Sequence, residues 1–272
     1  MIGLLERSFR FLRRFYIVRR IYETAYQWGL NPLQFAVMIL GIPRYLKMML
    51  SYYRAWDGGR FPLRITSLSP IAVQWQRLAG ETTGHYFHQD LWAARKIFEA
   101  CPKQHIDIGS RIDGFAAHIL TFMPITILDI RPLESDVIGL TFVQGDAVTL
   151  TGFADNSVGS LSSLHAVEHF GLGRYGDEVD PVACFKSMRE MARVLKGGGR
   201  LYFSVPIGAE HLVFNAYRVF SPRTILDAFG ELELVSFAAV DDAGDFHDQV
   251  EPEDFIAAKF ACGLFEFTKK GR

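Results

Sequence analysis

The sequence has few cysteines: Cys101, Cys184 and Cys262 are the only three among 272 residues. They are too few and too scattered for a disulfide framework or a zinc knuckle, so we expect reduced, mostly buried thiols and a cytoplasmic protein. Long apolar runs are also lacking. The longest near the start covers the eight residues 35–42, whereas a bilayer crossing needs about 20. The sequence therefore predicts no transmembrane helix, and no apolar core of a signal peptide follows the basic N-terminus.

The net charge is only −1, but it is unevenly divided. Residues 1–60 hold ten Lys and Arg against three Asp and Glu, a net of +7, and the remaining residues carry a net of −8. The acidic main part has the wrong sign for a phosphate backbone, so we predict no nucleic-acid partner. Hydrophobic residues make up 49% and charged residues 22% of the chain. That composition indicates a globular protein with a sizeable core.

The basic segment, residues 1–60, is predicted to be an amphipathic helical arm. Residues 4–28 contain no proline or glycine, and Leu5, Phe9, Leu12 and Tyr16 share one helical face, with arginines on the other. A second apolar helix is predicted over residues 33–53. Two hypotheses stay open. The arm either packs as a lid or a dimerisation element with its arginines solvated, or residues 4–28 lie on the anionic surface of the inner membrane.

Residues 61–89 are predicted to be an irregular connector, and regular alternation begins at residue 90. We expect helices over residues 90–100, 114–122, 182–195 and 222–229. We expect strands over residues 105–108, 125–130, 140–144, 158–164, 199–205, 232–240 and 263–268. Strands alternating with helices predict an α/β domain over residues 90–272. Its fold class is a mostly parallel, seven-stranded, Rossmann-like sheet with helices on both faces.

Acidic residues follow the first three predicted strands, where an open parallel sheet binds its ligands. After the first strand come Asp107 and Gly109, and the glycine allows the backbone to turn tightly towards a ligand at the start of the next helix. Asp129 ends the second strand and can accept both hydroxyls of a ribose. Asp146 ends the third strand and can accept an adenine amino hydrogen. Any one of these acids alone can also be explained as a helix cap.

Taken in order, these motifs resemble the class I methyltransferases that use S-adenosylmethionine. The resemblance covers residues 90–272 and continues through residues 155–158, 162–169 and 191–201. The last stretch is the most specific: Lys196 suits a helix C-terminus, and three glycines suit a left-handed exit. More narrowly, the chain is similar to a bacterial methyltransferase-like family whose members often accompany polysaccharide synthesis. The resemblance implies a Rossmann-like methyltransferase sheet with S-adenosylmethionine held by Asp107, Gly109, Ser110, Arg111, Asp129, Asp146, Ala147 and Leu164.

One departure concerns Arg111 and Asp113, which stand where the family usually has glycine. The Arg111 side chain either fills the site and excludes the cofactor, or pairs with the methionine carboxylate of the cofactor. The first possibility keeps open an alternative function, a non-catalytic methyltransferase-like binding module that has lost the cofactor. A nicotinamide-dependent oxidoreductase is disfavoured, because the turn lacks G-x-G-x-x-G.

The segment His165-Ala-Val-Glu168-His169 follows the fourth expected strand, on the acceptor side of the cofactor. As H-x-x-E-H it matches an inverted zinc-protease signature, but that chemistry needs both histidines on one helical face. The resemblance to related O-methyltransferases implies that Glu168 and His169 hold a divalent cation such as Mg²⁺. The alternative is that both only orient the loop. For deprotonation of an acceptor hydroxyl, His165 is the first candidate base and His169 the second.

Further polar residues follow the fifth expected strand. His211, Asn215, Tyr217 and Arg218 are candidates to contact a sugar, or alternatively belong to an ordered surface loop. Together the sequence predicts a methyltransferase, O-directed, acting on a small molecule or a glycan intermediate.

Overall fold

The computed structural model describes residues 25–26, 29–71, 80 and 82–271. The chain divides into two compact units, residues 1–81 and 82–272. Of the N-terminal helix predicted over residues 4–28, the structure describes only Ala25 and Tyr26, and then residues 29–30 beyond it. The rest of this helix lies outside the described residues, and so does the surface that was predicted to face the membrane. In the part of the chain that the structure describes, no helix combines the length and the apolar character that a membrane crossing needs.

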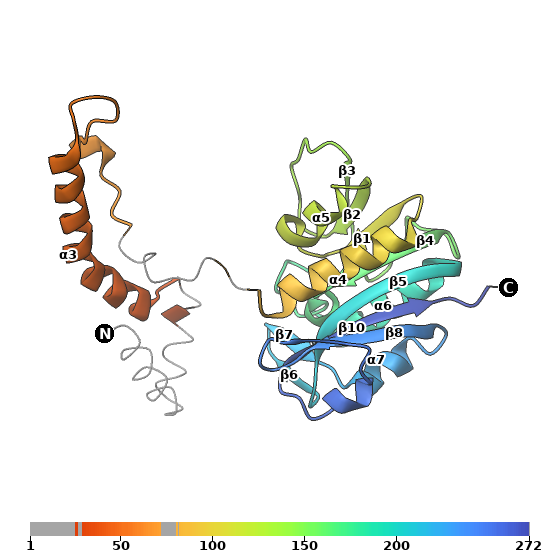
Figure 1. Ribbon diagram of the computed structural model, residues 1–272. Helices are drawn as coiled ribbons and strands as arrows, with labels where there is room; N and C mark the ends of the chain where they lie inside the picture. Colours follow the sequence, from red (N-terminus) through yellow and green to blue (C-terminus); the bar gives the residue numbers. More distant parts are fainter. Residues whose placement is uncertain (1–24, 27–28, 72–79, 81, 272) are drawn as a thin grey trace. The chain divides into compact units, whose positions relative to one another are not determined.

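The first unit contains the helix α3, Pro32–Ala55, which confirms the helix predicted over residues 33–53. Asn31 caps its N-terminus by accepting a hydrogen bond from the Gln34 backbone N–H at 3.0 Å. Beyond the helix the chain turns back at Asp57, and the Tyr52 hydroxyl donates to the Phe61 carbonyl at 2.8 Å. A short 3-10 turn, η1 at Ile65–Ser67, follows. Figure 1 shows this returning segment beside α3.

The second unit is built on an eight-stranded sheet in the order β3-β2-β1-β4-β5-β10-β8-β9 (Figure 1). The strands β1 His105–Ile108, β2 Ile125–Asp129, β3 Leu140–Gln144, β4 Val158–Leu164 and β5 Leu195–Ile207 pair in parallel. β10, Ala261–Thr268, inserts antiparallel between β5 and β8, Glu233–Val240. The strand order reverses direction between β1 and β4, which is where such sheets bind ligands.

Two hydrophobic cores cover the two faces of this sheet. On one face, α4 (His85–Ala100), the π-helical turn η3 (Ile112–Ala116) and α5 (Ala117–Ile119) pack Trp92, Ile97 and Phe115 against the strands. On the other face, α6 (Ala183–Val194) and α7 (Pro222–Ala228) contribute Met188 and Ile225 to the larger core. The predicted fold class, a mostly parallel Rossmann-like sheet with helices on both faces, is therefore confirmed.

The predicted strand count of seven is too low by one. The additional strand is β9, Phe246–Asp248, which pairs antiparallel with β8. A separate hairpin joins β6, His211–Val213, to β7, Tyr217–Val219. Each of these three strands has only three residues. Such a length is too short for the alternation of polar and apolar residues that identifies a strand in a sequence.

The helices differ from the prediction in their bounds, most of all at residues 114–122, where the structure has the π-helical turn η3 followed by α5, Ala117–Ile119. α4 begins at His85, five residues before the predicted start. The sequence gives no signal for this start, because the N-cap residue is Gly84, which has no side chain to cap the helix. The end of α6 also differs: Leu195 is extended and fully buried and already belongs to β5, so the glycines make no left-handed helix exit. Lys196 does not complete the helix C-terminus. The Lys269 ammonium instead donates to the carbonyl oxygens of Ala192 and Arg193, at 2.7 and 3.3 Å.

Candidate functional site

The buried carboxylate of Asp107 fixes the turn after β1 by accepting hydrogen bonds from it. This carboxylate accepts hydrogen bonds from the Ser110 backbone N–H at 3.0 Å, from the Ser110 hydroxyl at 2.6 Å and from the Ser162 hydroxyl. The Ser110 hydroxyl in turn accepts from the backbone N–H of Leu164 at 2.9 Å. Burial raises the pKa of Asp107 to about 6, against the opposing effect of these hydrogen bonds. Asp107 and Ser110 therefore join the ends of β1 and β4 rather than face a ligand.

Gly109 occupies the one position of this turn that requires glycine. Its φ is +68°, and a Cβ there would lie 3.1 Å from the Cβ of Ala166. The Gly109 N–H donates to the Leu128 carbonyl at 2.9 Å, which ties the turn to β2. The turn consequently presents bare backbone to the space above the strand ends.

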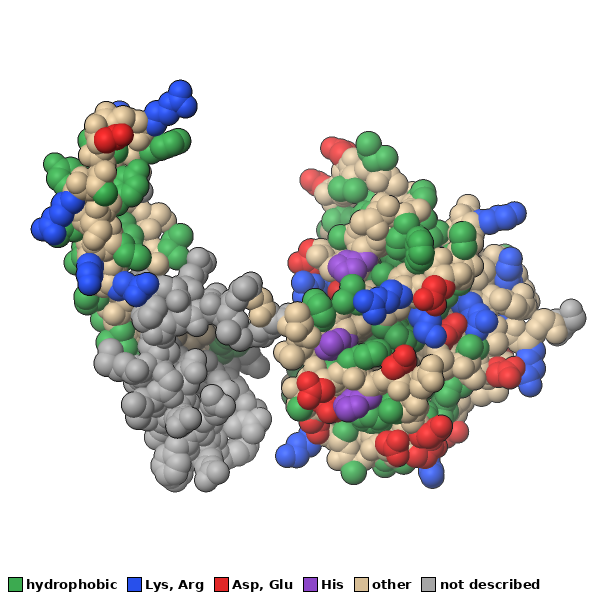
Figure 2. All heavy atoms as spheres, viewed as in Figure 1, with side chains coloured by type: hydrophobic (Ala, Val, Ile, Leu, Met, Phe, Trp, Pro, Cys, Tyr) green, Lys and Arg blue, Asp and Glu red, His purple; other side chains and the backbone are tan. Residues whose placement is uncertain are grey.

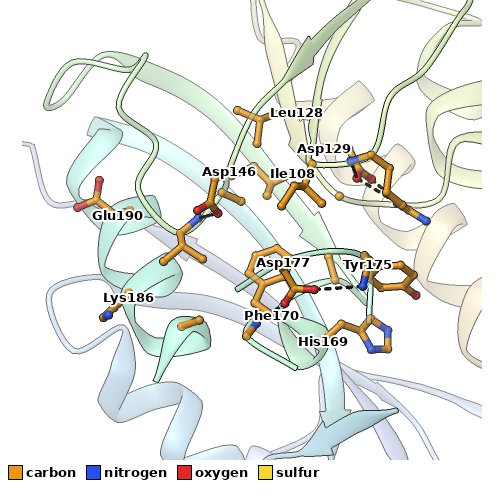
Figure 3. Close-up of a pocket in the computed structure, with 18 of the residues that line it drawn as sticks. Ile108, Leu128, Asp129, Asp146, His169, Phe170, Tyr175, Asp177, Lys186 and Glu190 are labelled. Atoms are coloured by element: carbon orange, nitrogen blue, oxygen red, sulfur yellow. Dashed lines mark hydrogen bonds and ion pairs between the residues drawn. The ribbon is translucent and has the colours of Figure 1, made fainter. Parts of the chain in front are cut away.

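That space is a cavity of about 750 Å³ at the carboxyl edge of the parallel strands (Figure 3). Its volume falls within the range of about 300–1,000 Å³ that is usual for small-molecule sites. The cavity is lined by residues from α4, β1, β2 and β4, from the segment after β3, from the loop 170–178 and from α6. Eight of the predicted site residues line it: Gly109, Arg111, Asp129, Asp146, Ala147, Leu164, His165 and His169. The other three, Asp107, Ser110 and Glu168, are buried behind its wall.

The two acids at the ends of β2 and β3 both face the cavity. Asp129 is paired with Arg131: its Oδ1 accepts from the backbone N–H and Nε of Arg131 at 2.9 and 3.0 Å, and its Oδ2 accepts from a terminal guanidinium nitrogen at 2.6 Å. The Arg131 guanidinium also lies 4.6 Å from the ring centre of Tyr175. Asp146 accepts from the backbone N–H of Val148 at 2.8 Å through Oδ1 only. Figure 3 shows both carboxylates near Ile108 and Leu128.

Arg111 lies at the rim and does not fill the cavity. Its Nε donates to Asp113 Oδ1 at 2.6 Å, and the two side chains are 51% and 77% exposed. Its guanidinium lies 5.2 Å from the ring centre of Tyr86. The possibility that Arg111 fills the site is therefore wrong for this structure, because the cavity stays open beside it.

The segment after β4 forms a short 3-10 turn, η4 at Val167–His169, and not an α-helix. Its two histidines consequently do not share a helical face, which rules out the inverted zinc-protease arrangement. The carboxylate of Glu168 is 1% exposed and pairs with Nδ1 of His165 at 2.6 Å. This orientation, away from the cavity, gives no support to a magnesium site on Glu168 and His169.

His165 and His169 differ sharply in their surroundings. His165 has a left-handed φ of +49°, and both its nitrogens are engaged, by Glu168 and by Nδ1 of His85 at 3.1 Å. Burial acts to lower the pKa of His165, but the neighbouring Cys262 and Glu168 raise it well above the usual value. His169 instead faces the cavity, and only its Nδ1 is hydrogen-bonded, to the Ala216 carbonyl at 2.6 Å. Burial lowers the pKa of His169.

One side of the cavity is shaped by the loop 170–178, which the sequence did not reveal. Asp177 organises this loop by accepting backbone hydrogen bonds from Gly171, Gly173 and Tyr175 at 2.8, 3.2 and 3.1 Å. Burial acts to raise the pKa of Asp177, but these hydrogen bonds lower it overall. The polar lining that sequence reasoning missed comprises Tyr86, Arg131, Tyr175, Asp177, Lys186, Arg189 and Glu190. The glycines of the loop were its one visible signal.

The four acceptor candidates after β5 do not line this cavity. His211, Tyr217 and Arg218 lie on the β6–β7 hairpin and Asn215 lies between its strands. Arg218 supports the site indirectly, because its guanidinium donates to the Phe170 carbonyl at 2.7 Å and so fixes the start of the loop.

A family model described as "Caenorhabditis protein of unknown function, DUF268" matches residues 146–259, which is less than half of the chain. No curated protein matches the sequence. Similar solved structures include the [4+2]-cyclase SpnF, with 13% identity, a TM-score of 0.49, and coverage of 67% of this chain and 82% of that chain.

Two further similar structures come from bacteria. The YcgJ protein from Bacillus subtilis has 16% identity and a TM-score of 0.47, covering 68% of this chain and 99% of that one. The N-methyltransferase NodS from Bradyrhizobium japonicum, in complex with S-adenosyl-L-homocysteine, has 11% identity and a TM-score of 0.46, covering 68% and 88%. At these identities the likeness concerns the fold alone, and the chemistry rests on the site itself.

Proposed function

We propose that this protein is an S-adenosylmethionine-dependent methyltransferase. The observation that carries the proposal is the convergence of the Gly109 turn, Asp129 and Asp146 on one cavity of about 750 Å³ at the point where the strand order reverses. Each feature alone is common. Three of them in register on neighbouring strands make a site for a nucleoside with an anionic tail.

The residues present fit this cofactor. Asp129 would hold the ribose hydroxyls, Asp146 the adenine amino group and the bare backbone at Gly109 the amino-acid portion. Ile108, Leu128 and Ala147 supply apolar lining for the adenine ring. When bound, the cofactor supplies a sulfonium methyl group that is open to nucleophilic attack.

For this fit, the Arg131 side chain has to give up part of its hydrogen bonding to Asp129. Each carboxylate oxygen has two lone pairs, and Oδ1 already accepts two hydrogen bonds from Arg131 while Oδ2 accepts one. The Arg131 side chain is 51% exposed but that of Asp129 only 11%, and the guanidinium binds the carboxylate through two nitrogens, so the pair is stronger than an ordinary surface ion pair. For cofactor binding, the ribose hydroxyls would have to replace at least one of these two guanidinium hydrogen bonds.

For the acceptor we propose a hydroxyl on a small molecule or a glycan intermediate, with His169 as the base. Nδ1 of His169 is hydrogen-bonded to the Ala216 carbonyl at 2.6 Å, and Nε2 makes no hydrogen bond to the described residues and lies 3.8 Å from Glu168 Oε1. Burial lowers the pKa of His169, so the ring is neutral at pH 7 with its proton on Nδ1. Nε2 would then take the hydroxyl proton while the acceptor oxygen takes the methyl group and the C–S bond of the sulfonium breaks. The groups facing His169 are Glu168, Arg174, His165 and Tyr175. His165, the first candidate from the sequence, is less suited because both its nitrogens are engaged.

A methyl-transfer assay tests this function. The wild-type chain and His169→Gln are incubated with S-adenosylmethionine labelled in the methyl group and with fractionated cell extracts. We expect wild-type label in a small-molecule or glycan fraction, lowered about 10²- to 10⁴-fold in the variant, the range usual for loss of a general base. An ether methyl survives alkali, whereas an ester methyl is released as methanol. Alkali-labile label, or equal transfer by the variant, would contradict the assignment of a hydroxyl acceptor and of the base.

The alternative function, a binding module without cofactor, draws on the Asp129–Arg131 pair. If Arg131 keeps its hydrogen bonds to Asp129, that carboxylate cannot bind ribose hydroxyls, and the cavity remains without binding a nucleoside. Binding of S-adenosylhomocysteine to the wild-type chain separates the two functions without any knowledge of the acceptor.

We also propose that residues 1–60 hold the protein at an anionic membrane surface. α3 carries Arg44, Lys47 and Arg54 and no acidic residue. Its exposed apolar side chains include Phe35, Ile39, Leu46 and Tyr53, and Figure 2 shows apolar and basic side chains mixed along it. We expect the full-length chain to sediment with phosphatidylglycerol vesicles but not with phosphatidylcholine vesicles, and the double variant Lys47→Glu, Arg54→Glu to sediment less. Sedimentation with neither vesicle would refute the proposal.

A further inference from the structure

Three side chains that are distant in the sequence meet beside the cavity. His85 is the first residue of α4, His165 follows β4, and Cys262 is the second residue of β10. One nitrogen of each ring and the sulfur of Cys262 all lie within 4.8 Å of one another. The closest pair is Nδ1 of His85 and Nε2 of His165, at 3.1 Å. No part of the proposed methyl transfer uses this cluster.

The outer nitrogen of each ring is already fixed, so that the inner nitrogens face each other. Nδ1 of His165 bonds to Glu168 at 2.6 Å. The His85 ring is hydrogen-bonded to the backbone of Phe260 and stacks between the rings of Phe260 and His165, with centroids 5.1 Å from each. A histidine that binds a metal almost always gives its other N–H to a carboxylate or a backbone carbonyl. Both histidines of the cluster have such a partner.

Glu168, the carboxylate that is hydrogen-bonded to His165, is a second indication of a bound cation. Glu168 Oε2 is buried and has no hydrogen-bond partner. A buried carboxylate oxygen without a partner is costly unless a positive charge lies nearby. A dication at the cluster would supply that charge: one thiolate and one carboxylate balance two positive charges, and the two histidines bind as neutral rings.

We propose that His85, His165 and Cys262 bind one thiophilic transition-metal ion, of which Zn²⁺ is the type. Tetrahedral zinc has Zn–N distances of about 2.0–2.1 Å and a Zn–S distance of about 2.3 Å, so ligand atoms stand roughly 3.3–3.7 Å apart. The observed separations, 3.1 Å between the nitrogens and at most 4.8 Å within the cluster, need only a small inward shift of the sulfur. Two nitrogens and a sulfur exclude Mg²⁺ and Ca²⁺, which prefer oxygen ligands.

The ion has one position left for a further ligand. His165 and its neighbour in space, Tyr86, both line the cavity, with ring centroids 5.3 Å apart. The site is therefore a three-ligand site beside a cavity, the arrangement in which zinc keeps an exchangeable position. Cys262 and His165 are 0% and 8% exposed, so metal enters from the side of His85, which is only partly buried.

Cobalt titration of the full-length, reduced protein tests the proposal, because Co²⁺ replaces Zn²⁺ and is coloured. We expect one Co²⁺ per chain, with intense visible bands of a tetrahedral site and a near-ultraviolet thiolate charge-transfer band, both removed by Zn²⁺. Cys262→Ser is expected to lose the charge-transfer band. His85→Gln, at the surface-accessible ligand, is expected to weaken Co²⁺ affinity at least tenfold.

Cys184→Ser is the matched control, because Cys184 is equally buried and belongs to α6 in the larger core, outside the cluster. It is expected to keep both the stoichiometry and the spectrum. Thermal melting of each variant without metal shows which of them are folded. The proposal is overturned if the folded wild-type chain takes up no Co²⁺, if its Co²⁺ spectrum lacks the thiolate band, or if Cys184→Ser removes that band. Because the readout is metal content and colour, the outcome does not depend on whether the cavity binds a nucleoside.

Discussion

The exposed pair of Arg111 and Asp113 at the cavity rim allows a prediction that separates the two ends of the proposed cofactor. We expect Arg111 to exchange Asp113 for the amino-acid carboxylate of S-adenosylhomocysteine. A hydrogen bond involving a charged group contributes about 1.5–3 kcal/mol, and the surface pair given up is worth at most about 1 kcal/mol because both side chains are more than half exposed. The difference, about 0.5–2 kcal/mol, means that Arg111→Ala weakens binding about 2- to 30-fold.

The complementary change is Asp113→Asn, which removes the competing carboxylate and keeps the shape of the side chain. It is expected to tighten S-adenosylhomocysteine binding by up to about fivefold. The control ligand is 5′-deoxy-5′-methylthioadenosine, which keeps the nucleoside and lacks the carboxylate, so its affinity should be the same for both variants and the wild type. Calorimetric titration measures all six combinations. The reasoning is refuted if Arg111→Ala leaves S-adenosylhomocysteine binding unchanged, or weakens both ligands equally.

Two further predictions concern stability, measured by chemical denaturation. Gly171→Ala would place a Cβ 2.0 Å from the Asp180 carbonyl oxygen, at a φ of +74°. It should lower the free energy of unfolding by at least about 2 kcal/mol more than the control Gly176→Ala, where the φ is +85° and nothing lies within 4 Å. Equal losses in the two variants would show that the loop relaxes freely. Burial lowers the pKa of His105 to about 3, so the folded state binds fewer protons than the unfolded state between about pH 3 and 6.5. Stability is therefore lost as the pH falls through this window, by up to about 1.4 kcal/mol per pH unit. His105→Asn should remove that part of the slope, whereas parallel pH profiles would contradict the assignment.

Much of the sheet could be predicted from the sequence because its strands are short and bounded by turn residues. β1, β3 and β4 have the predicted bounds. β1 and β4 are mostly buried inside the sheet, whereas β3, at its edge, is half-buried or exposed. The acids Asp129 and Asp146 also follow from this pattern, since the carboxyl ends of parallel strands meet at one edge.

Features set by tertiary contacts could not be predicted in this way. α4 starts after Gly84 without a capping side chain, so nothing local marks His85 as helical. His85 and Cys262 are 177 positions apart in the sequence, and only the insertion of β10 beside β5 brings the cysteine to the histidines. The pairing of Arg131 with Asp129 is a local contact of two neighbouring side chains, but its direction into the cavity depends on Tyr175 in the distant loop.

The order of the two candidate bases changed for the same reason. His165 stands nearest the strand end in the sequence, which made it the first candidate. In the structure its left-handed backbone turns the ring towards Glu168 and His85, whereas His169 lines the cavity and its Nε2, 3.8 Å from Glu168 Oε1, makes no hydrogen bond within the part of the chain that the structure describes. Sequence spacing specifies which residues follow a strand, but not which of them the turn directs into the site.

The most direct test of the central claim is a calorimetric titration of the folded, full-length protein with S-adenosylhomocysteine. The account predicts that the wild type binds. In Asp129→Ala the affinity should fall at least about 30-fold, because the hydrogen bonds to the ribose hydroxyls are lost. Asp136→Ala should keep wild-type affinity, because Asp136 is exposed and does not line the cavity. Folded wild-type protein that binds neither S-adenosylhomocysteine nor S-adenosylmethionine would contradict the account and favour the binding module without cofactor.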